Sequence, residues 1–122
     1  MIYHKSEVAS ILQEAPMPVV SNHECAAKLA KAPEKGLRHD NRTWTITDNM
    51  ICAGDPGKTK SGGCYGDSGG PLACKNAAGK WLLEGIVSWG DPDCSSANHY
   101  TVFTRVTNFQ QWIEDKINFY KY

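Results

Sequence analysis

The stretch Gly62-Gly63-Cys64-Tyr65-Gly66-Asp67-Ser68-Gly69-Gly70-Pro71-Leu72 is the most informative part of the chain. Its glycines allow the backbone to turn sharply and to approach a ligand closely. A serine hydroxyl in such a turn can stand exposed, and the amide hydrogens of Gly66 and Ser68 can point together toward one oxygen atom. Donors placed in this way stabilise negative charge that develops only in a transition state. The stretch therefore predicts a nucleophilic serine beside two backbone donors. The alternative is an ordinary glycine-rich turn.

Two other motifs in this region are disfavoured by length and spacing. Gly66-x-Ser68-x-Gly70 also fits the nucleophile elbow of α/β-hydrolases, where Asp91 or Asp93 and then His99 would follow in that fold's chain order. A chain of 122 residues without alternating strands and helices is too short for that doubly wound sheet. The segment 54–59 is not a phosphate-binding loop, because the pattern needs a glycine at position 52, where the chain has cysteine.

Hydrophobic periodicity predicts an all-β domain. Strands are expected at residues 50–53 and 101–106, and at 71–75 and 81–89 on either side of a hairpin turn. The segment 11–20 is expected to be extended, and Pro16 and Pro18 restrict it to a sheet edge or a strand end. No long apolar stretch suggests a membrane span.

Two helical segments interrupt this pattern. Residues 25–29 can form a helical turn behind Ser21 and Asn22, which are typical N-cap residues. At the far end, Thr107 and Asn108 are candidate caps for an amphipathic helix. The apolar residues at helical spacing there are Phe109, Trp112, Ile113, Ile117 and Tyr120.

The segment Gly66-Asp67-Ser68-Gly69-Gly70-Pro71-Leu72 resembles the nucleophile loop of chymotrypsin-like serine proteases. The resemblance runs from about residue 11 to the last residue, although the loop at 30–43 is longer than is typical. It implies a fold in which this chain is the C-terminal six-stranded antiparallel β-barrel of a two-barrel protease, with a C-terminal α-helix. Residues 1–122 are then the second half, and the N-terminal barrel is absent from this chain. Other matching segments are Met50-Ile51-Cys52-Ala53-Gly54, Gly85-Ile86-Val87-Ser88-Trp89-Gly90, Val102-Phe103-Thr104-Arg105-Val106 and Trp112-Ile113.

The resemblance also implies roles for the residues of this loop. Ser68 would be the nucleophile that forms an acyl-enzyme, and the amides of Gly66 and Ser68 would form the oxyanion hole. Asp67 would pair with a new N-terminal amine after zymogen cleavage. Without that amine we expect Asp67 to be a buried and unpaired carboxylate, which is costly.

The substrate-binding residues follow from the same resemblance. Ser88, Trp89 and Gly90 would line a strand that pairs with an extended peptide. Gly62, next to Gly63 at the base of the specificity pocket, carries no acid, so we expect apolar, chymotrypsin- or elastase-like specificity. Gly90 leaves the entrance open, and the opposite wall falls on Thr101 or on Tyr100. Asp91 and Asp93 would either bias the rim toward basic residues or be solvated loop charges.

Five cysteines, an odd number, stand in this small glycine-rich chain. There is no C-x-x-C and no histidine pair at zinc spacing, so neither a metal nor another cofactor is expected. Widely spaced cysteines favour disulfides and a secreted, extracellular protein. The resemblance implies the pairs Cys25–Cys52 and Cys64–Cys94. It places the partner of Cys74 upstream, in the missing half.

The catalytic base is the missing element. The family's histidine and aspartate loops have no counterpart here, and His4, His23, His39 and His99 lie in no matching motif. The first hypothesis is therefore a serine endopeptidase that cleaves protein or peptide substrates only when combined with its N-terminal half. The alternative is a non-catalytic protease homologue or fragment that binds peptides or proteins. Thirteen basic and thirteen acidic residues argue against a nucleic-acid partner, and Asn41 begins an N-x-T sequon.

Overall fold

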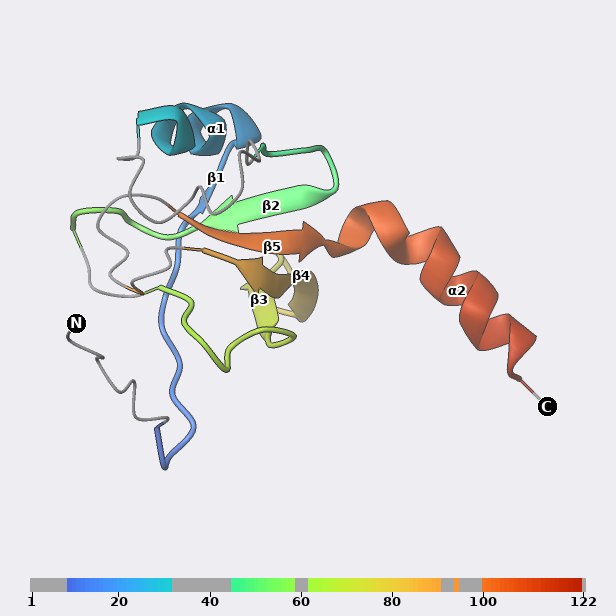
Figure 1. Cartoon of the computed structure of the whole chain (residues 1–122). Helices are drawn as coiled ribbons and strands as arrows, with labels where there is room; N and C mark the ends of the chain where they lie inside the picture. Colours follow the sequence, from blue (N-terminus) through green and yellow to red (C-terminus); the bar gives the residue numbers. More distant parts are fainter. Residues whose placement is uncertain (1–8, 32–44, 59–61, 91–93, 95–99, 122) are drawn as a thin grey trace.

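The computed structural model describes residues 9–31, 45–58, 62–90, 94 and 100–121 (Figure 1). Five strands form one antiparallel sheet in the order β1-β2-β5-β4-β3. The strands are β1 (Val19–Val20), β2 (Met50–Ala53), β3 (Pro71–Lys75), β4 (Trp81–Trp89) and β5 (Thr101–Arg105). The helices are α1 (Asn22–Lys31), the 3₁₀ turn η1 (Val106–Phe109) and α2 (Gln110–Phe119).

Strand β5 is the centre of the sheet, because it pairs with β2 on one side and with β4 on the other. Successive side chains of a strand point to opposite faces. Val102 accordingly packs with Cys25 and Cys52 in one buried cluster, and Phe103 packs with Ile51 in a second. The domain therefore has a small core on each face of β5.

The β3–β4 hairpin forms as predicted, with the expected bounds for both strands. Asn76 closes the turn, because its side-chain oxygen accepts hydrogen bonds from the amides of Ala78 and Lys80, each at 3.0 Å. Gly79 takes a φ of +79°, which glycine adopts without the steric penalty of other residues. The hairpin thus follows from the turn sequence itself.

Helix α1 is longer than the predicted turn at 25–29, and it begins directly after Ser21. The Glu24 amide donates to the Ser21 hydroxyl oxygen at 3.1 Å, which is the expected N-cap bond. Asn22 does not act as a cap: its side-chain nitrogen donates to the carbonyl oxygens of Thr47 and Met50, and its oxygen accepts from Arg105 at 2.7 Å. The helix is thereby fastened to the β2–β5 side of the sheet.

Helix α2 forms, but its predicted caps are wrong. No side chain caps its first turn, which is preceded by η1. The Asn108 side chain is used elsewhere, donating to the Asp48 carbonyl oxygen at 2.7 Å. Figure 1 shows α2 extending away from the sheet. The exposed large apolar residues are Trp112, Ile117 and Phe119 on α2 and Tyr120 directly after it.

The predicted six-stranded barrel does not form among the described residues, whose five-stranded sheet stays open between β1 and β3. Edge strand β1 has only two residues, and Pro16 and Pro18 before it have no amide hydrogen for a longer ladder. The antiparallel sheet without strand–helix crossovers also rules out the α/β-hydrolase alternative for the described part. No helix in that part is long and apolar enough to cross a membrane.

Candidate active site

The loop of residues 62–70, here called the nucleophile loop, is closed by Asp67. The Asp67 amide donates to the Cys64 carbonyl oxygen at 3.0 Å, and the Asp67 carboxylate accepts from the Cys64 amide at 2.8 Å. The Asp67 carbonyl accepts from Gly70 at 2.9 Å. Gly66 and Gly69 take φ angles of +97° and +86°, in the left-handed region that favours glycine. The two glycines therefore allow the tight turns on either side of Ser68.

Strand β4 holds the end of this loop. The Gly69 amide donates to the Val87 carbonyl oxygen and the Val87 amide donates to the Gly70 carbonyl oxygen, both at 2.9 Å. These bonds continue the β3–β4 ladder beyond Pro71, which pairs with Ile86. Ser68, one residue before the ladder, is exposed. Its position relative to the sheet is thus set by backbone hydrogen bonds.

Two amide donors flank Asp67 without an acceptor. Within the part of the chain that the structure describes, the amides of Gly66 and Ser68 donate to no protein group, whereas that of Asp67 is used. A Cβ atom built on Gly66 would meet nothing within 4 Å, so the space beside it is open. Both amides therefore remain available to an acceptor from outside the described structure, and their role as an oxyanion hole stays a prediction.

The expectation of a buried, unpaired Asp67 is wrong for this structure. Asp67 is exposed and its carboxylate has a partner in the Cys64 amide. An aspartate can satisfy itself in this way by a bond to backbone three residues away. Asp67 therefore does not carry the penalty of an isolated buried charge here.

Thr101, Gly63 and Gly90 meet at the start of β5. Thr101 is only 5% exposed, and its hydroxyl oxygen accepts from the Gly63 amide at 2.8 Å. A Cβ on Gly63 would lie 2.8 Å from the Thr101 methyl carbon, and one on Gly90 would lie 3.7 Å from the Thr101 Cα. Gly62 is half-buried beside them. Of the two residues considered for the opposite wall, it is Thr101 that contacts Gly63.

The end of β4 is irregular. Val87 pairs with Phe103 and Trp89 with Val102, which leaves Ser88 as an extra, exposed residue in a β-bulge. Bulges twist a strand and redirect its side chains, and they are common next to active sites. Trp89 packs against the cluster that contains Val102. Of the three residues predicted to line a peptide-binding strand, Gly90 thus lies against Thr101 and Trp89 pairs with the next residue, Val102.

Both disulfides implied by the resemblance are present, Cys25–Cys52 and Cys64–Cys94. The first links α1 to β2, and the second links the nucleophile loop to the segment before β5. Cys74 is a free, half-buried thiol on β3. Burial, and secondarily the Glu84 carboxylate, raise the pKa of this thiol above its ordinary value.

A catalytic base is not found among the described residues. Their one histidine, His23, is exposed on α1, and Figure 1 shows α1 on the opposite side of the sheet from the segment that leads into β3. Several predicted positions lie outside the described residues: His4, His39, His99, Asn41, Asp91 and Asp93. No group of three or more His, Cys, Asp or Glu residues in the described part is arranged to hold a metal ion.

Comparison with known families completes this picture. The family model Trypsin matches residues 3–113. The chain belongs to the trypsin family. The match includes the nucleophile loop and all five strands, so membership of the trypsin family rests on the same segments that carry the site.

Three relatives in the trypsin family are about equally similar. The chain is 40% identical to a tryptase of Mus musculus over 84% of its own length and 34% of the tryptase. It is 40% identical to clotting factor C of Tachypleus tridentatus over 89% of the chain and 10% of that protein. It is 39% identical to the urokinase-type plasminogen activator of Gallus gallus, over 90% and 22%. The chain therefore spans about a third or less of these relatives.

One contact near the site is not predictable from trypsin-family motifs. The Tyr100 hydroxyl donates to a Glu24 carboxylate oxygen at 2.9 Å, across 76 residues of sequence. A buried tyrosine usually has a hydrogen-bond partner for its hydroxyl, so a tyrosine at position 100 predicts that such a partner exists. The sequence contains nothing that names Glu24 as that partner.

Proposed function

We propose that this chain is the nucleophile-bearing half of a serine endopeptidase that hydrolyses peptide bonds through an acyl-enzyme on Ser68. The observation that carries the proposal is the nucleophile loop. It exposes a serine whose own amide and that of Gly66 have no acceptor in the described structure. Membership of the trypsin family supports the same chemistry.

In this proposal each group has its own step. The Ser68 oxygen attacks the substrate carbonyl carbon while its proton passes to a base, and the carbonyl oxygen becomes an oxyanion. The amides of Gly66 and Ser68 donate to this oxyanion, and one such donor is typically worth about 3–4 kcal/mol. Collapse of this intermediate breaks the C–N bond while the base passes its proton to the leaving amine, so the acyl group stays on the Ser68 oxygen. Water then attacks the acyl carbon and gives a proton to the base, and the base returns that proton to the Ser68 oxygen as the new carboxylic acid leaves.

The base comes from a second half in this proposal. A serine without a base is a weak nucleophile, and loss of a triad member leaves about 10³–10⁴-fold rate enhancement over water. Residues 1–122 then form the second barrel, and contacts with the N-terminal half cover the open sheet and supply a histidine and an aspartate. Asp67 changes partner in that assembly, from the Cys64 amide to a new N-terminal amine.

Exposed apolar residues on β4 support the proposal that another part of the protease covers this end of the sheet. Trp81, Leu82 and Leu83 are consecutive on β4 and are 65%, 43% and 49% exposed. Because consecutive residues point to opposite faces, both faces of this part of β4 are uncovered. In this proposal the Cys74 thiol on β3, free in this chain, forms a disulfide with the other half.

Apolar specificity follows from the proposed pocket. Gly62 contributes no acid to pair with a lysine or arginine of the substrate. Thr101 fills the space beside Gly63, which favours small apolar side chains over large ones. Two disulfides favour an oxidising, extracellular setting.

The test is labelling of the native protein by a serine-reactive fluorophosphonate, read by intact and peptide mass spectrometry. We expect one label per molecule, on Ser68, only when the companion half is present, and none in Ser68→Ala. Ser10→Ala, which removes another exposed serine, is the matched control and should label normally. A native, assembled protein that never labels at any pH refutes the proposal.

A second candidate is a non-catalytic homologue that binds peptides. The absence of a base near Ser68 among the described residues favours it. Such a protein would bind an extended peptide along Ser88–Gly90 without cleaving it. Peptide binding measured by calorimetry, with no labelling and no hydrolysis, distinguishes this function from the first.

A further inference from the structure

Thr101, the proposed pocket wall, is held by the β-ladder on one side only. It pairs with Ala53 of β2, whereas the last pair between β4 and β5 joins Trp89 to Val102. Thr101 therefore lies one residue beyond the end of the β4–β5 ladder. Its side chain accepts a hydrogen bond from Gly63, which lies in the nucleophile loop and not in a strand of the sheet.

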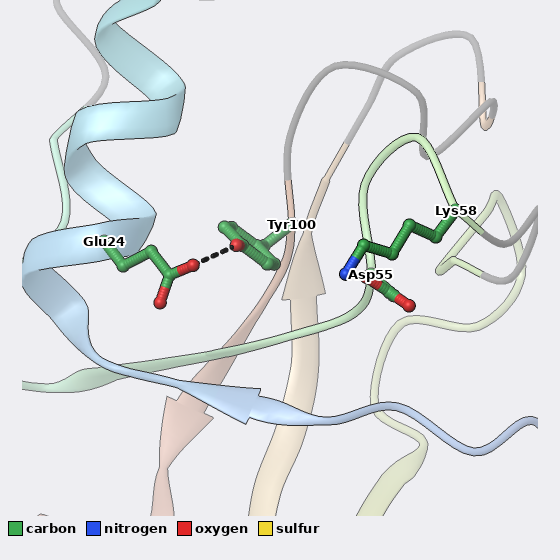
Figure 2. A network of polar contacts seen from close by, with 4 residues as sticks. All are labelled: Glu24, Asp55, Lys58 and Tyr100. Carbon is green, nitrogen blue, oxygen red and sulfur yellow. Dashed lines mark hydrogen bonds and ion pairs between the residues drawn. The ribbon is translucent and has the colours of Figure 1, made fainter.

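Tyr100 supplies a second anchor at this point. Its ring is 9% exposed and packs in the cluster of Cys25, Cys52 and Val102. Its hydroxyl donates to Glu24, which lies in the first turn of α1 (Figure 2). Because residue 25 is bonded to residue 52, the helix turn that carries Glu24 is itself fixed to β2.

The opposite side of the ring faces the loop after β2. Figure 2 shows Tyr100 between Glu24 and the Asp55–Lys58 pair. That pair is 3.9 Å apart with Lys58 80% exposed, so it is weak and screened by water. Gly54 lies against the ring, since a Cβ there would lie 3.7 Å from a Tyr100 ring carbon, an ordinary van der Waals distance. The hydrogen bond to Glu24 therefore ties the hydroxyl to α1, on the other side of the ring from this pair.

We propose that Glu24 and Tyr100 are positioning residues for the specificity pocket: their hydrogen bond fixes the start of β5 and so keeps Thr101 against Gly63. The inference rests on the proposed endopeptidase function. The connection runs from α1 through Tyr100 and Thr101 to Gly63, and from there to the loop that carries Ser68. When the bond is lost, Thr101 moves more freely and the pocket admits larger side chains.

The test compares peptide p-nitroanilides with alanine or phenylalanine before the scissile bond, using the native, assembled protease after active-site titration. Tyr100→Phe removes the hydroxyl but keeps the ring, and Glu24→Ala removes the acceptor. Each should lower the ratio of kcat/KM for alanine over phenylalanine by about tenfold, the scale on which pocket contacts discriminate. Glu24→Gln keeps an oxygen that accepts the same hydrogen, so its ratio should stay within about twofold.

A purely structural role gives a different result. Loss of folded protein lowers the titrated fraction and leaves the ratio unchanged. Tyr120→Phe, which removes another tyrosine hydroxyl on an exposed residue, is the matched control.

An unchanged ratio in both Tyr100→Phe and Glu24→Ala overturns this inference and leaves the endopeptidase proposal intact. If Tyr100→Phe does not fold, Glu24→Ala decides, because Glu24 is exposed and its removal leaves no cavity. Absence of any hydrolysis by the unmutated assembly overturns the proposed function and this inference with it.

Discussion

The hydrogen bond between Gly63 and Thr101 makes a quantitative prediction. Thr101→Val keeps the shape of the side chain and replaces only the hydroxyl that accepts from the Gly63 amide at 2.8 Å. An amide left without an acceptor costs about 1–3 kcal/mol, and because Gly63 is half-buried we take the lower part, about 1–2 kcal/mol. We therefore expect replacement of this one hydroxyl by a methyl group to lower the free energy of unfolding measurably.

Urea denaturation of the native protein measures this loss. With an m-value of about 2 kcal/mol/M, the midpoint should fall by about 0.5–1 M. Thr104→Val is the matched control on the same strand, because the Thr104 hydroxyl makes no hydrogen bond within the described residues. Its midpoint should stay within about 0.2 M, as expected of a substitution that breaks no contact. Equal midpoints for the two variants would refute the assigned role of the Thr101 hydroxyl.

Three further predictions concern the core, Tyr100 and Cys74. Gly85→Ala places a Cβ 2.8 Å from the Phe103 Cβ, so urea denaturation should show a loss of about 1–3 kcal/mol; an unchanged midpoint would contradict the close packing. Burial, then Glu24 and Asp55, raise the pKa of Tyr100, so its proton is held more tightly in the folded state. The unfolding free energy should therefore fall as the pH rises above about 10, more steeply than in Tyr100→Phe; parallel curves would argue against it. Because the pKa of Cys74 is raised by burial and by Glu84, alkylation of the free thiol by iodoacetamide at pH 8, in the chain without its companion half, should be slower when the chain is folded than in urea and faster in Glu84→Gln, as read by mass spectrometry.

Local patterns predicted the strands well. The bounds of β2, β3 and β4 agree with the expected segments, because alternation and turn residues act within a few positions. β5 ends at Arg105, one residue earlier than expected, since Val106 already belongs to η1. Capping was predictable only where the residue had no other partner: Ser21 caps α1, but Asn108 bonds to Asp48 instead of to α2.

Contacts between distant segments were beyond the local patterns. The sequence left the pocket wall open between Tyr100 and Thr101, and only their contacts separate them: one bonds to Glu24 and the other to Gly63. Barrel closure failed as a prediction among the described residues, because it depends on which strand edges meet in space. The disulfide pairs came from the family resemblance and are confirmed.

The placement of the two cross-links divides the molecule into unequal parts. One joins α1 to β2 and the other joins residues 64 and 94, whereas the β3–β4 hairpin and α2 carry none in the described structure. Reduction would then relax the surface around Ser68 while the hairpin keeps its backbone bonds, which hydrogen exchange with and without a reductant can measure. In a reducing compartment, the surface around Ser68 would therefore lose its fixed position before the sheet unfolds.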